Sequence, residues 1–278
     1  MEFKRLSILG VGLLGGSIGL AVKRLASGGE IVGYGHRAST LETAMRLGAI
    51  DRSTTSAADA VRGADLVILC TPVGTFRPLL QEIAGSLTPG AIVTDVGSTK
   101  RSVVRLAEEL LPESVHFVGS HPMAGSEKRG VEFAKADLFS GALCILTLSG
   151  RTNVGALAKV ENFWAELGMR TKRLTPDDHD RLICDVSHLP HALAASLVAM
   201  QSDAALELAG KGFQDTTRVA AGDAGLWRDI LLDNADSVKS SIARLRSQLD
   251  ELEKRLDPSQ AKALFEWLQA AADKRSRQ

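Results

Sequence analysis

A strand-like segment followed at once by spaced glycines constrains the fold of this 278-residue chain more than any other feature. Residues 6–9 are Leu-Ser-Ile-Leu, and Gly10, Gly12 and Gly15 come directly before residues 17–25, which are compatible with a helix. In such a unit the first glycine permits a sharp turn, the second lets the backbone approach a pyrophosphate, and the third lets the helix lie close to the strand. The sequence therefore predicts a dinucleotide-binding unit; the alternative is a tight turn without a ligand.

The composition argues against several classes of protein. Lys plus Arg and Asp plus Glu both number 33, so no net charge favours a nucleic-acid or membrane partner. Cys70, Cys144 and Cys184 have no CxxC spacing and indicate reduced side chains, and we expect the first two to be buried. We find no signal peptide and no apolar stretch near the ~18 residues that span a membrane, and we expect a soluble cytoplasmic protein.

Strand-like and helix-like segments alternate through residues 1–174. The expected strands are 6–9, 30–34, 64–70, 91–96, 115–119, 142–147 and 170–174. The expected helices after the first are 40–47, 56–62, 75–86, 100–111 and 154–167. Because parallel neighbours need a crossover connection, this alternation predicts a Rossmann-type, doubly wound parallel sheet.

Residues 175–278 show no convincing strand pattern and predict an all-helical domain. The expected helices are about 178–202, 203–212, 215–222, 224–255 and 258–275. The segment 224–255 has apolar residues at a three-to-four spacing, which form one stripe: Ile230, Leu231, Ala235, Val238, Ile242, Leu245, Leu249 and Leu252. We expect this helix to pair with a second subunit in a homodimer; ordinary packing within the domain is the alternative.

The end of the second strand bears on the choice of dinucleotide. An acidic residue about 20 positions after the glycines normally accepts hydrogen bonds from the ribose hydroxyls. Here Gly35 takes that place, and His36, Arg37, Ser39 and Thr40 follow. Without a carboxylate nothing repels a 2′-phosphate, and a guanidinium suits that group, so we favour NADP over NAD. A solvent-exposed turn is the alternative reading.

Three short segments, 71–73, 95–100 and 119–127, follow the carboxyl ends of expected strands. Ligands of α/β sheets bind at this edge, and the segments bring Ser98 and His121 to it on glycine-rich loops. A histidine there can serve as general base for an alcohol proton, and a nearby serine can orient both base and substrate. The residues alone leave a structural role for His121 equally open. The residues expected to contact the cofactor are Gly10, Gly12, Leu13, Leu14, Gly15, His36, Arg37, Ser39, Thr40, Thr71, Pro72 and Ser98.

Four short motifs occur together in this chain. They are Gly-Ser-His-Pro-Met-Ala-Gly-Ser-Glu at 119–127, Thr-Asp-Val-Gly-Ser-Thr-Lys at 94–100, Ser-His-Leu-Pro-His-Ala at 187–192 and Gly-Phe-Gln-Asp-Thr-Thr-Arg at 212–218. This combination, in this order, resembles the prephenate/arogenate dehydrogenase family of tyrosine biosynthesis. The resemblance implies an N-terminal dinucleotide domain, a helical dimerisation domain and oxidative decarboxylation of a cyclohexadienyl acid.

The resemblance also implies roles for individual residues. His121 matches the family's catalytic base on the ring hydroxyl, and Ser98 matches the serine that hydrogen-bonds both. Arg218 matches the arginine that binds a substrate carboxylate. The residues that match positions framing the substrate pocket are Glu127, Asp215, His188 and His191.

Several alternatives stay open at this point. His188 and His191 could be core histidines, and without an acidic or cysteine companion they make a poor zinc site, so we expect no metal. Arg218 could pair with Asp215 three residues earlier. Other candidate functions are a dehydrogenase of the β-hydroxyacid or imine reductase type and a non-catalytic NADP sensor. The sequence does not distinguish prephenate from arogenate, which differ in a pyruvyl or alanyl side chain.

Overall fold

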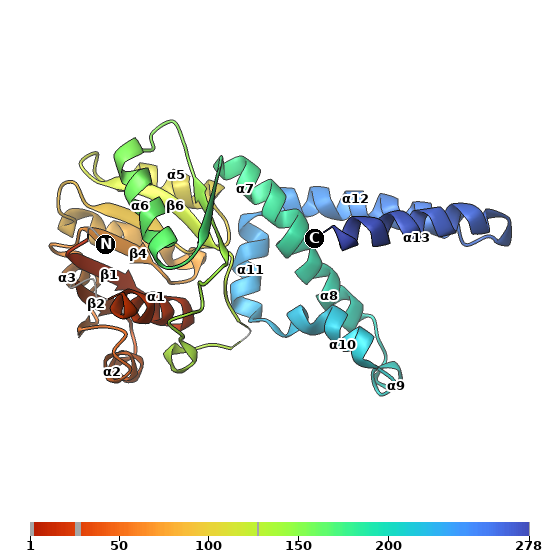
Figure 1. Cartoon of the computed structure of the whole chain (residues 1–278), viewed down its shortest axis with the longest axis horizontal. Helices are drawn as coiled ribbons and strands as arrows, with labels where there is room; N and C mark the ends of the chain where they lie inside the picture. Colours follow the sequence, from red (N-terminus) through yellow and green to blue (C-terminus); the bar gives the residue numbers. More distant parts are fainter. Residues whose placement is uncertain (1–2, 26–28, 127, 278) are drawn as a thin grey trace.

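The computed structural model of the protein describes residues 3–25, 29–126 and 128–277. An α/β region and a helical region adjoin each other, and two long C-terminal helices project away from the sheet (Figure 1). The last strand of the α/β region ends at Leu174, and the first helix of the second region begins at Pro176.

The α/β region is built on one sheet, which has eight strands within the described residues. The strands are β1 Arg5–Leu9, β2 Glu30–Tyr34, β3 Arg52–Thr54, β4 Leu66–Leu69, β5 Ile92–Asp95, β6 His116–Pro122, β7 Leu143–Thr147 and β8 Arg170–Leu174, in the spatial order β3-β2-β1-β4-β5-β6-β7-β8. The predicted Rossmann-type architecture is confirmed. The expectation of an entirely parallel sheet is wrong at one place, because β6 and β7 pair antiparallel.

That antiparallel pair changes where β6 ends. Residues 116–118 pair with β5, and residues 119–122 continue the same strand against β7, with His121 opposite Ile145. The predicted strand ended at Gly119, with His121 on the loop after it. Glycine, serine and proline have low strand propensity, so local preference hid the extension, which the pairing with β7 stabilises. The short, exposed strand β3 was missed because it carries no apolar run.

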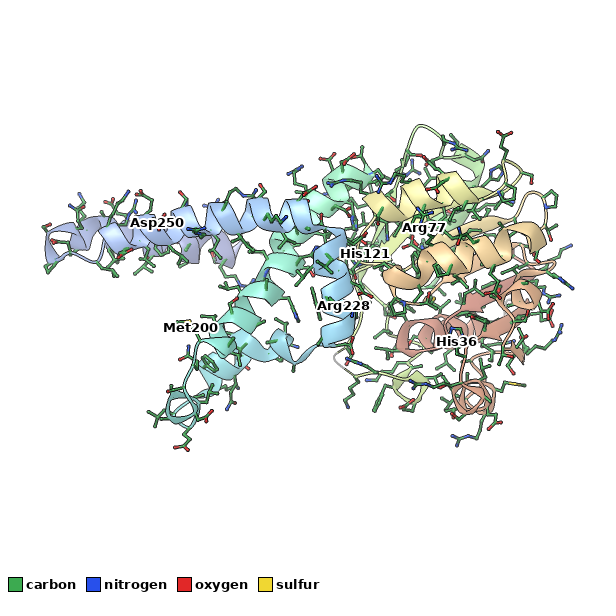
Figure 2. All side chains as sticks on the ribbon, turned by 180° about the vertical axis from the view of Figure 1, so that it is seen from behind. His36, Arg77, His121, Met200, Arg228 and Asp250 are labelled. Carbon is green, nitrogen blue, oxygen red and sulfur yellow. The ribbon has the colours of Figure 1, made fainter. Side chains whose placement is uncertain are left out.

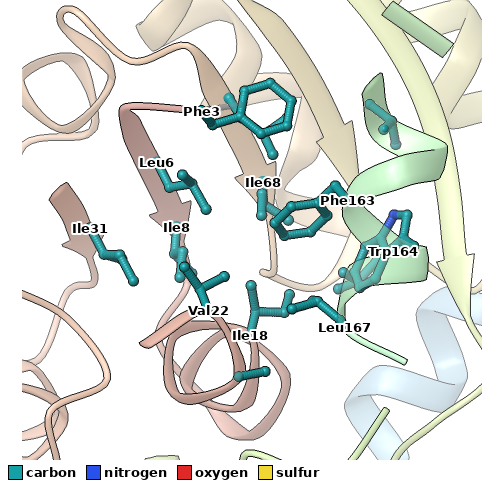
Figure 3. Close-up of a cluster of buried hydrophobic side chains, with 14 of the residues drawn as sticks. Phe3, Leu6, Ile8, Ile18, Val22, Ile31, Ile68, Phe163, Trp164 and Leu167 are labelled. Atoms are coloured by element: carbon teal, nitrogen blue, oxygen red, sulfur yellow. The ribbon is translucent and has the colours of Figure 1, made fainter. Parts of the chain in front are cut away.

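The helices of the α/β region cover both faces of the sheet. They are α1 Leu13–Arg24, α2 Ala38–Arg46, α3 Ala57–Val61, α4 Phe76–Ile83, α5 Arg101–Leu110 and α6 Val154–Glu166. Alternate strand residues enter two separate buried clusters: Leu66 and Ile68 face one, Val67 and Leu69 the other. The first cluster includes side chains of α1 and the aromatic rings of α6 (Figure 3). Because the central strands are buried on both faces, their sequences are nearly continuous runs of apolar residues.

The helical region differs from the sequence-based expectation mainly in where its helices break. Its helices are α7 Pro176–Ile183, α8 Leu189–Ala199, α9 Asp203–Leu206, α10 Lys211–Thr217, α11 Ala224–Asp233, α12 Ala235–Lys254 and α13 Ala261–Ser276. The expected helix 224–255 is two helices, interrupted at Asn234, and the expected helix 215–222 spans the end of α10 and the 3-10 turn at 218–221. The apolar stripe is therefore divided: Ile230 and Val238 are buried within the chain, whereas Ile242 and Leu249 are exposed.

Helices α7 and α8 form one continuous helix through a π-helical turn at Cys184–His188. Pro190 lies in the first turn of α8 and has no amide hydrogen to donate, and a local π turn accommodates such an interruption. By length and composition alone, the helix Pro176–Ala199 could cross a membrane, contrary to the sequence-based expectation that no segment could. Its sequence contains no long uninterrupted apolar run, because histidine and serine are interspersed among leucine and alanine.

The three cysteines are free thiols. Cys144 is buried as expected, and Cys184 is buried too. Cys70 is only partly buried, contrary to expectation, because it lies at the end of β4, where the strand gives way to the loop above the glycine turn.

Candidate active site

The glycine turn between β1 and α1 has the geometry of a phosphate-binding loop. Gly10 has φ +106°, and a Cβ there would lie 2.8 Å from Cys70 and Thr71. A Cβ on Gly15 would lie 2.2 Å from the carbonyl oxygen of Gly10, so helix and strand approach closely. Nothing lies within 4 Å of a Cβ built on Gly12. Because Gly12 is also the N-cap of α1 and supplies no capping side chain, the first amides of the helix suit a pyrophosphate.

The end of β2 presents polar side chains to solvent. The hydroxyl of Tyr34 lies 3.4 Å from Nε2 of His36, and the two rings meet edge to face. Arg37 is the exposed N-cap of α2, and Ser39 and Thr40 lie in the first turn of that helix. These are the residues that could contact the adenosine ribose and its substituents.

A second turn follows β4 and meets the helical region. Thr75 Oγ1 donates to the carbonyl oxygen of Pro72 at 2.7 Å and lies 2.8 Å from Thr71 Oγ1. A Cβ on Gly74 would lie 2.7 Å from Oδ2 of Asp229, which belongs to α11. The predicted cofactor residues Thr71 and Pro72 therefore lie next to the junction between the two regions.

The loop that carries Ser98 is held by a buried ammonium group. Lys100 Nζ forms an ion pair with Asp95 Oδ2 at 2.6 Å, and both side chains are fully buried. The same ammonium donates to the carbonyl oxygens of Gly97 at 2.7 Å and Thr99 at 2.9 Å, so its three protons all have acceptors. The loop closes around this group and leaves Ser98 half-buried at the carboxyl end of β5.

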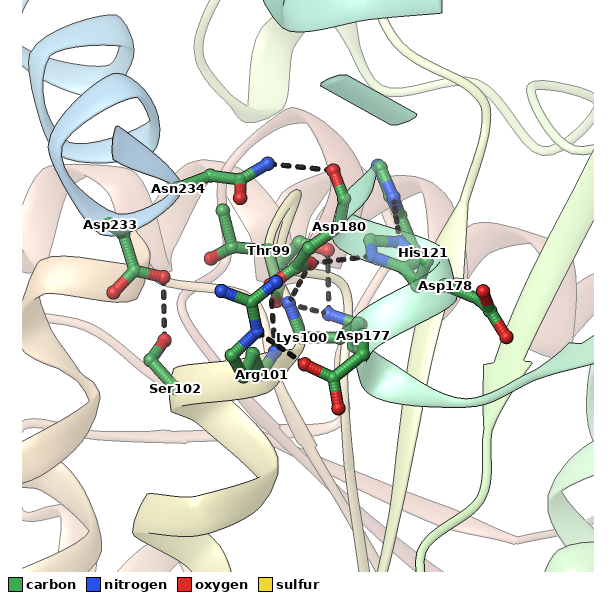
Figure 4. Close-up of polar contacts among 12 residues, drawn as sticks. Thr99, Lys100, Arg101, Ser102, His121, Asp177, Asp178, Asp180, Asp233 and Asn234 are labelled. Atoms are coloured by element: carbon green, nitrogen blue, oxygen red, sulfur yellow. Dashed lines mark hydrogen bonds and ion pairs between the residues drawn. The ribbon is translucent and has the colours of Figure 1, made fainter. Parts of the chain in front are cut away.

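His121 lies at the carboxyl end of β6, next to the helical region (Figure 2). Its Nδ1 lies 2.9 Å from Nε2 of His179, and Nδ1 of His179 lies 2.8 Å from Oδ1 of Asp180. The two oxygens of Asp180 also accept from the backbone amides of Lys100 at 2.7 Å and Arg101 at 2.9 Å, where α5 begins (Figure 4). A carboxylate of α7 thus caps a helix of the α/β region.

The surroundings of His121 keep its imidazole neutral. Burial, with the neighbouring His179, Lys100 and His188, holds its pKa well below the usual value of 6.5. Burial also lowers the pKa of His179, although Asp180 opposes that shift. A neutral imidazole can accept a proton, which is the first requirement of a general base. Ser98 makes no side-chain hydrogen bond to His121 within the described residues, so the predicted contact between these two is not formed here.

His188 and His191, predicted to frame a pocket, have different environments. His188 is fully buried in the π turn; its Nδ1 lies 3.1 Å from Nδ2 of Asn234, which donates to the carbonyl oxygen of Asp180 at 2.8 Å. Burial lowers the pKa of His188 to about 4. The ring of His191 stacks on Trp227 of α11, with centroids 3.6 Å apart and the planes 9° from parallel.

The other predicted substrate residues lie on exposed parts of the chain. Asp215 is exposed on α10, and Arg218 is exposed at the start of the following 3-10 turn. This turn packs against α8, the helix that carries His191. Glu127 lies outside the described residues. Near it in the chain, Arg129 forms an ion pair with Asp223, so the segment after β6 contacts the helical region.

Sequence reasoning missed the residues behind His121. His179 and Asp180 lie near the start of the first expected helix of the second region, and no role was predicted for either. A histidine next to an aspartate at a helix start was the available signal. Lys100 was read as the end of a motif, and its burial depends on tertiary packing. No group of three His, Cys, Asp or Glu side chains that could hold a metal ion occurs in the part of the chain that the structure describes.

Comparison with known proteins places this geometry in one family. The sequence models named "Prephenate dehydrogenase, nucleotide-binding domain" and "Prephenate dehydrogenase, dimerization domain" match residues 18–173 and 175–270. The prephenate dehydrogenase of Bacillus subtilis is 36% identical, over 96% of this chain and 74% of its own. The cyclohexadienyl dehydrogenase of Zymomonas mobilis is 34% identical, over 90% of this chain and 87% of its own.

A solved structure shows the same likeness in three dimensions. The prephenate dehydrogenase of Aquifex aeolicus, in complex with hydroxyphenyl propionate and NAD+, superposes with a TM-score of 0.93 at 35% identity, covering 100% of this chain and 99% of that one. The fold and site thus define an oxidoreductase with a nicotinamide nucleotide cofactor. The chain belongs to the prephenate dehydrogenase family, which confirms the resemblance seen in the sequence.

Proposed function

We propose that this protein catalyses the oxidative decarboxylation of prephenate, arogenate or both, with His121 as the general base. The observation that carries the proposal is a buried, neutral imidazole at the carboxyl end of the sheet, where α/β enzymes bind their ligands. Family membership supports the reaction type, and the position of His121 supports its assignment as the base. The β-hydroxyacid dehydrogenase, imine reductase and sensor alternatives lose their support, because the family comparisons cover nearly the whole chain.

In the proposed reaction the side chains of this protein transfer one proton. His121 takes the proton of the ring hydroxyl at Nε2, because its Nδ1 is directed at His179. The ring carbon that bears this hydroxyl would lose its hydrogen as a hydride, for which a bound nicotinamide would be the acceptor, and the same carbon would become a carbonyl. The bond from the ring to its carboxylate then breaks, carbon dioxide leaves, and the electron pair of that bond makes the ring aromatic. The resulting phenolate oxygen takes back the proton. Ser98 would orient the hydroxyl from the adjacent loop.

We propose that Arg218 binds a carboxylate of the substrate. A guanidinium engages a carboxylate through two parallel hydrogen bonds, and the turn that carries Arg218 packs on α8 beside the junction. Asp215, Glu127, His188 and His191 remain proposed as residues that frame the pocket. The stack of His191 on Trp227 and the contact of His188 with Asn234 would give that pocket rigid walls.

We propose NADP as the preferred cofactor, with NAD as the alternative. The glycine turn and the first turn of α1 would hold the pyrophosphate, and exposed Arg37 at the start of α2 would bind a 2′-phosphate. Among residues 34–40 no carboxylate is present to repel that phosphate. The relative from Aquifex aeolicus was solved with NAD+, so this preference would be a property of the present chain.

We propose that the second region, from residue 175, forms a homodimer with a second copy. Its two projecting helices and the connection between them expose several large apolar side chains: Ile242, Leu249, Leu256, Phe265 and Leu268. The match to a dimerization domain supports this assignment.

A cytoplasmic location likewise remains a prediction, supported by the free thiols of all three cysteines.

Steady-state rates with both acids and both nicotinamide nucleotides, four combinations in all, test the proposed function. Reduced nicotinamide absorbs at ~340 nm, so each rate is read directly. We expect turnover with at least one acid, and faster turnover with NADP than with NAD at limiting cofactor. The absence of turnover in all four combinations would overturn the proposal. Turnover with NAD alone would overturn the cofactor preference and leave the reaction intact.

A further inference from the structure

We propose that His179 and Asp180 form a positioning relay that fixes the tautomer of His121 and leaves its Nε2 unprotonated to receive the substrate proton. This inference rests on the proposed function and adds two residues to it. The three groups are in series: Asp180 Oδ1 lies 2.8 Å from His179 Nδ1, and His179 Nε2 lies 2.9 Å from His121 Nδ1. His179 and Asp180 are almost completely buried, which excludes water as a competing partner.

The direction of the relay follows from the carboxylate. Burial raises the pKa of Asp180, but hydrogen bonds from His179 and from the amides of Arg101 and Lys100 together hold it below its ordinary value. An ionised carboxylate only accepts hydrogen bonds, so His179 must carry its proton on Nδ1. Nε2 of neutral His179 is then an acceptor, and Nδ1 of His121 must donate to it. The lone pair of His121 is therefore on Nε2.

The same hydrogen bonds also stabilise the protonated form of His121. When His121 takes a proton at Nε2, its Nδ1–H still donates to His179, and the negative charge of Asp180 lies at the far end of the chain. Other charged or titratable groups also lie close: Lys100 from the loop before α5 and His188 from the π turn act on His121, Asp95 from β5 acts on His179, and the thiol of Cys144 from β7 meets the backbone of His121. Asp95 is paired with Lys100, so Asp180 is the carboxylate linked to His121 by hydrogen bonds. A base oriented by a third group is a recurring arrangement in catalysis.

Two substitutions of His179 separate a positioning role from simple space filling. His179→Leu fills a similar volume but removes the acceptor for His121. His179→Gln keeps an acceptor oxygen for His121 and an amide donor for Asp180. His116→Leu, at the opposite end of β6, is the matched control. We expect kcat to fall roughly 10–100-fold in His179→Leu, less than the roughly 10²–10⁴-fold loss expected when the general base itself is removed, with KM changed less than about twofold. His179→Gln should recover most of kcat, and His116→Leu should match the parent enzyme.

A spectroscopic measurement tests the tautomer without relying on activity. Nitrogen-15 NMR of the histidine side chains distinguishes protonated from unprotonated ring nitrogens, and His121→Asn identifies the signals of His121. We expect Nε2 of His121 to be unprotonated in the parent protein, and a mixture of tautomers in His179→Leu. A proton on Nε2 in the parent protein, or equal loss of kcat in the Leu and Gln variants, would overturn the relay. If His179→Leu does not fold, the spectrum of the parent protein still decides.

These outcomes also separate the relay from the proposed function. A parent enzyme inactive with both acids would contradict the function itself. An active enzyme that loses turnover in His121→Asn but keeps it in His179→Leu would retain the function and lose the relay alone.

Discussion

The α/β region and the helical region bury apolar side chains to very different degrees. Both large hydrophobic clusters are formed by residues 3–169, on the two faces of the sheet. Beyond residue 175 few large apolar side chains are buried, and helix α13 contains no buried residue among those described. The first region therefore carries its own hydrophobic core, whereas the buried side chains of the second include polar ones such as His179, His191 and Ser241. The exposed apolar side chains of the helical region are the ones that the proposed homodimer would cover.

The proposed site combines His121 of the α/β region with Arg218 of the helical region. Substituting each residue separately tests whether the first acts in catalysis and the second in substrate binding. His121→Ala should lower kcat by roughly 10²–10⁴-fold, because a positioned base is lost from the transition state. Arg218→Ala should mainly raise KM for the acid, because the carboxylate contact is made in the ground state and the transition state alike. Steady-state kinetics of both variants measure this; the reverse pattern would mean that the two roles are exchanged.

The same base gives an expectation for pH. The pKa of His121 is lowered, so the neutral, active form persists below the usual value. The acid limb of kcat/KM should therefore lie below about pH 6.5, and activity should be lost only as the pH falls through the lowered pKa. A limb at or above that pH would contradict the burial of this imidazole in the working enzyme.

The buried ion pair of the sheet should matter more to stability than any exposed pair. Lys100→Met leaves Asp95 buried and unpaired, and we expect the free energy of unfolding to fall by about 3–5 kcal/mol in a urea titration. Arg77→Met is the matched control, because it breaks the exposed pair with Glu109, and the midpoint of the urea titration should hardly move. Equal losses in the two variants would show that the buried charges are compensated in some other way.

The exposed apolar side chains of the helical region should matter to assembly. Phe265→Glu removes an aromatic side chain from the proposed dimer interface, and a buried side chain of this size contributes about 1.5–3 kcal/mol. We expect the dissociation constant of the dimer, measured by sedimentation, to rise roughly tenfold to a hundredfold. Leu47→Glu, at an exposed apolar position of the α/β region, should leave it unchanged. A parent protein that sediments as a 29.5 kDa monomer at micromolar concentration would reject the dimer.

The smallest expected effect concerns the cofactor. Arg37→Ala should raise KM for NADP about tenfold, equivalent to about 1.4 kcal/mol, and change KM for NAD little. Arg46→Ala, in the last turn of the same helix α2, is the control for a general loss of positive charge. An unchanged KM for NADP in Arg37→Ala would show that this guanidinium does not contact a 2′-phosphate.

The two regions also differ in how well the sequence predicted them. In the α/β region, apolar runs and glycines are local signals, and the sequence located seven of the strands and the phosphate-binding turn. The antiparallel end of β6 and the interruption at Asn234 depend on long-range packing, which local patterns do not record. At the site, His121 was found through its motif. His179, Asp180 and Lys100 were not assigned roles, because their importance arises from burial and from contacts between residues 80 positions apart.

The cap that α7 provides to α5 bears on whether the two regions can be exchanged among relatives. Asp180 accepts hydrogen bonds from the backbone amides of Lys100 and Arg101. Any residue except proline at these two positions would supply the same donor. Consider a hybrid enzyme that combines the α/β region of one relative with the helical region of another, joined at residue 175. The carboxylate of its helical region would bind the two backbone amides whatever side chains the other region carries. The helical region could then change its assembly surface over time while the nucleotide-binding half stayed the same.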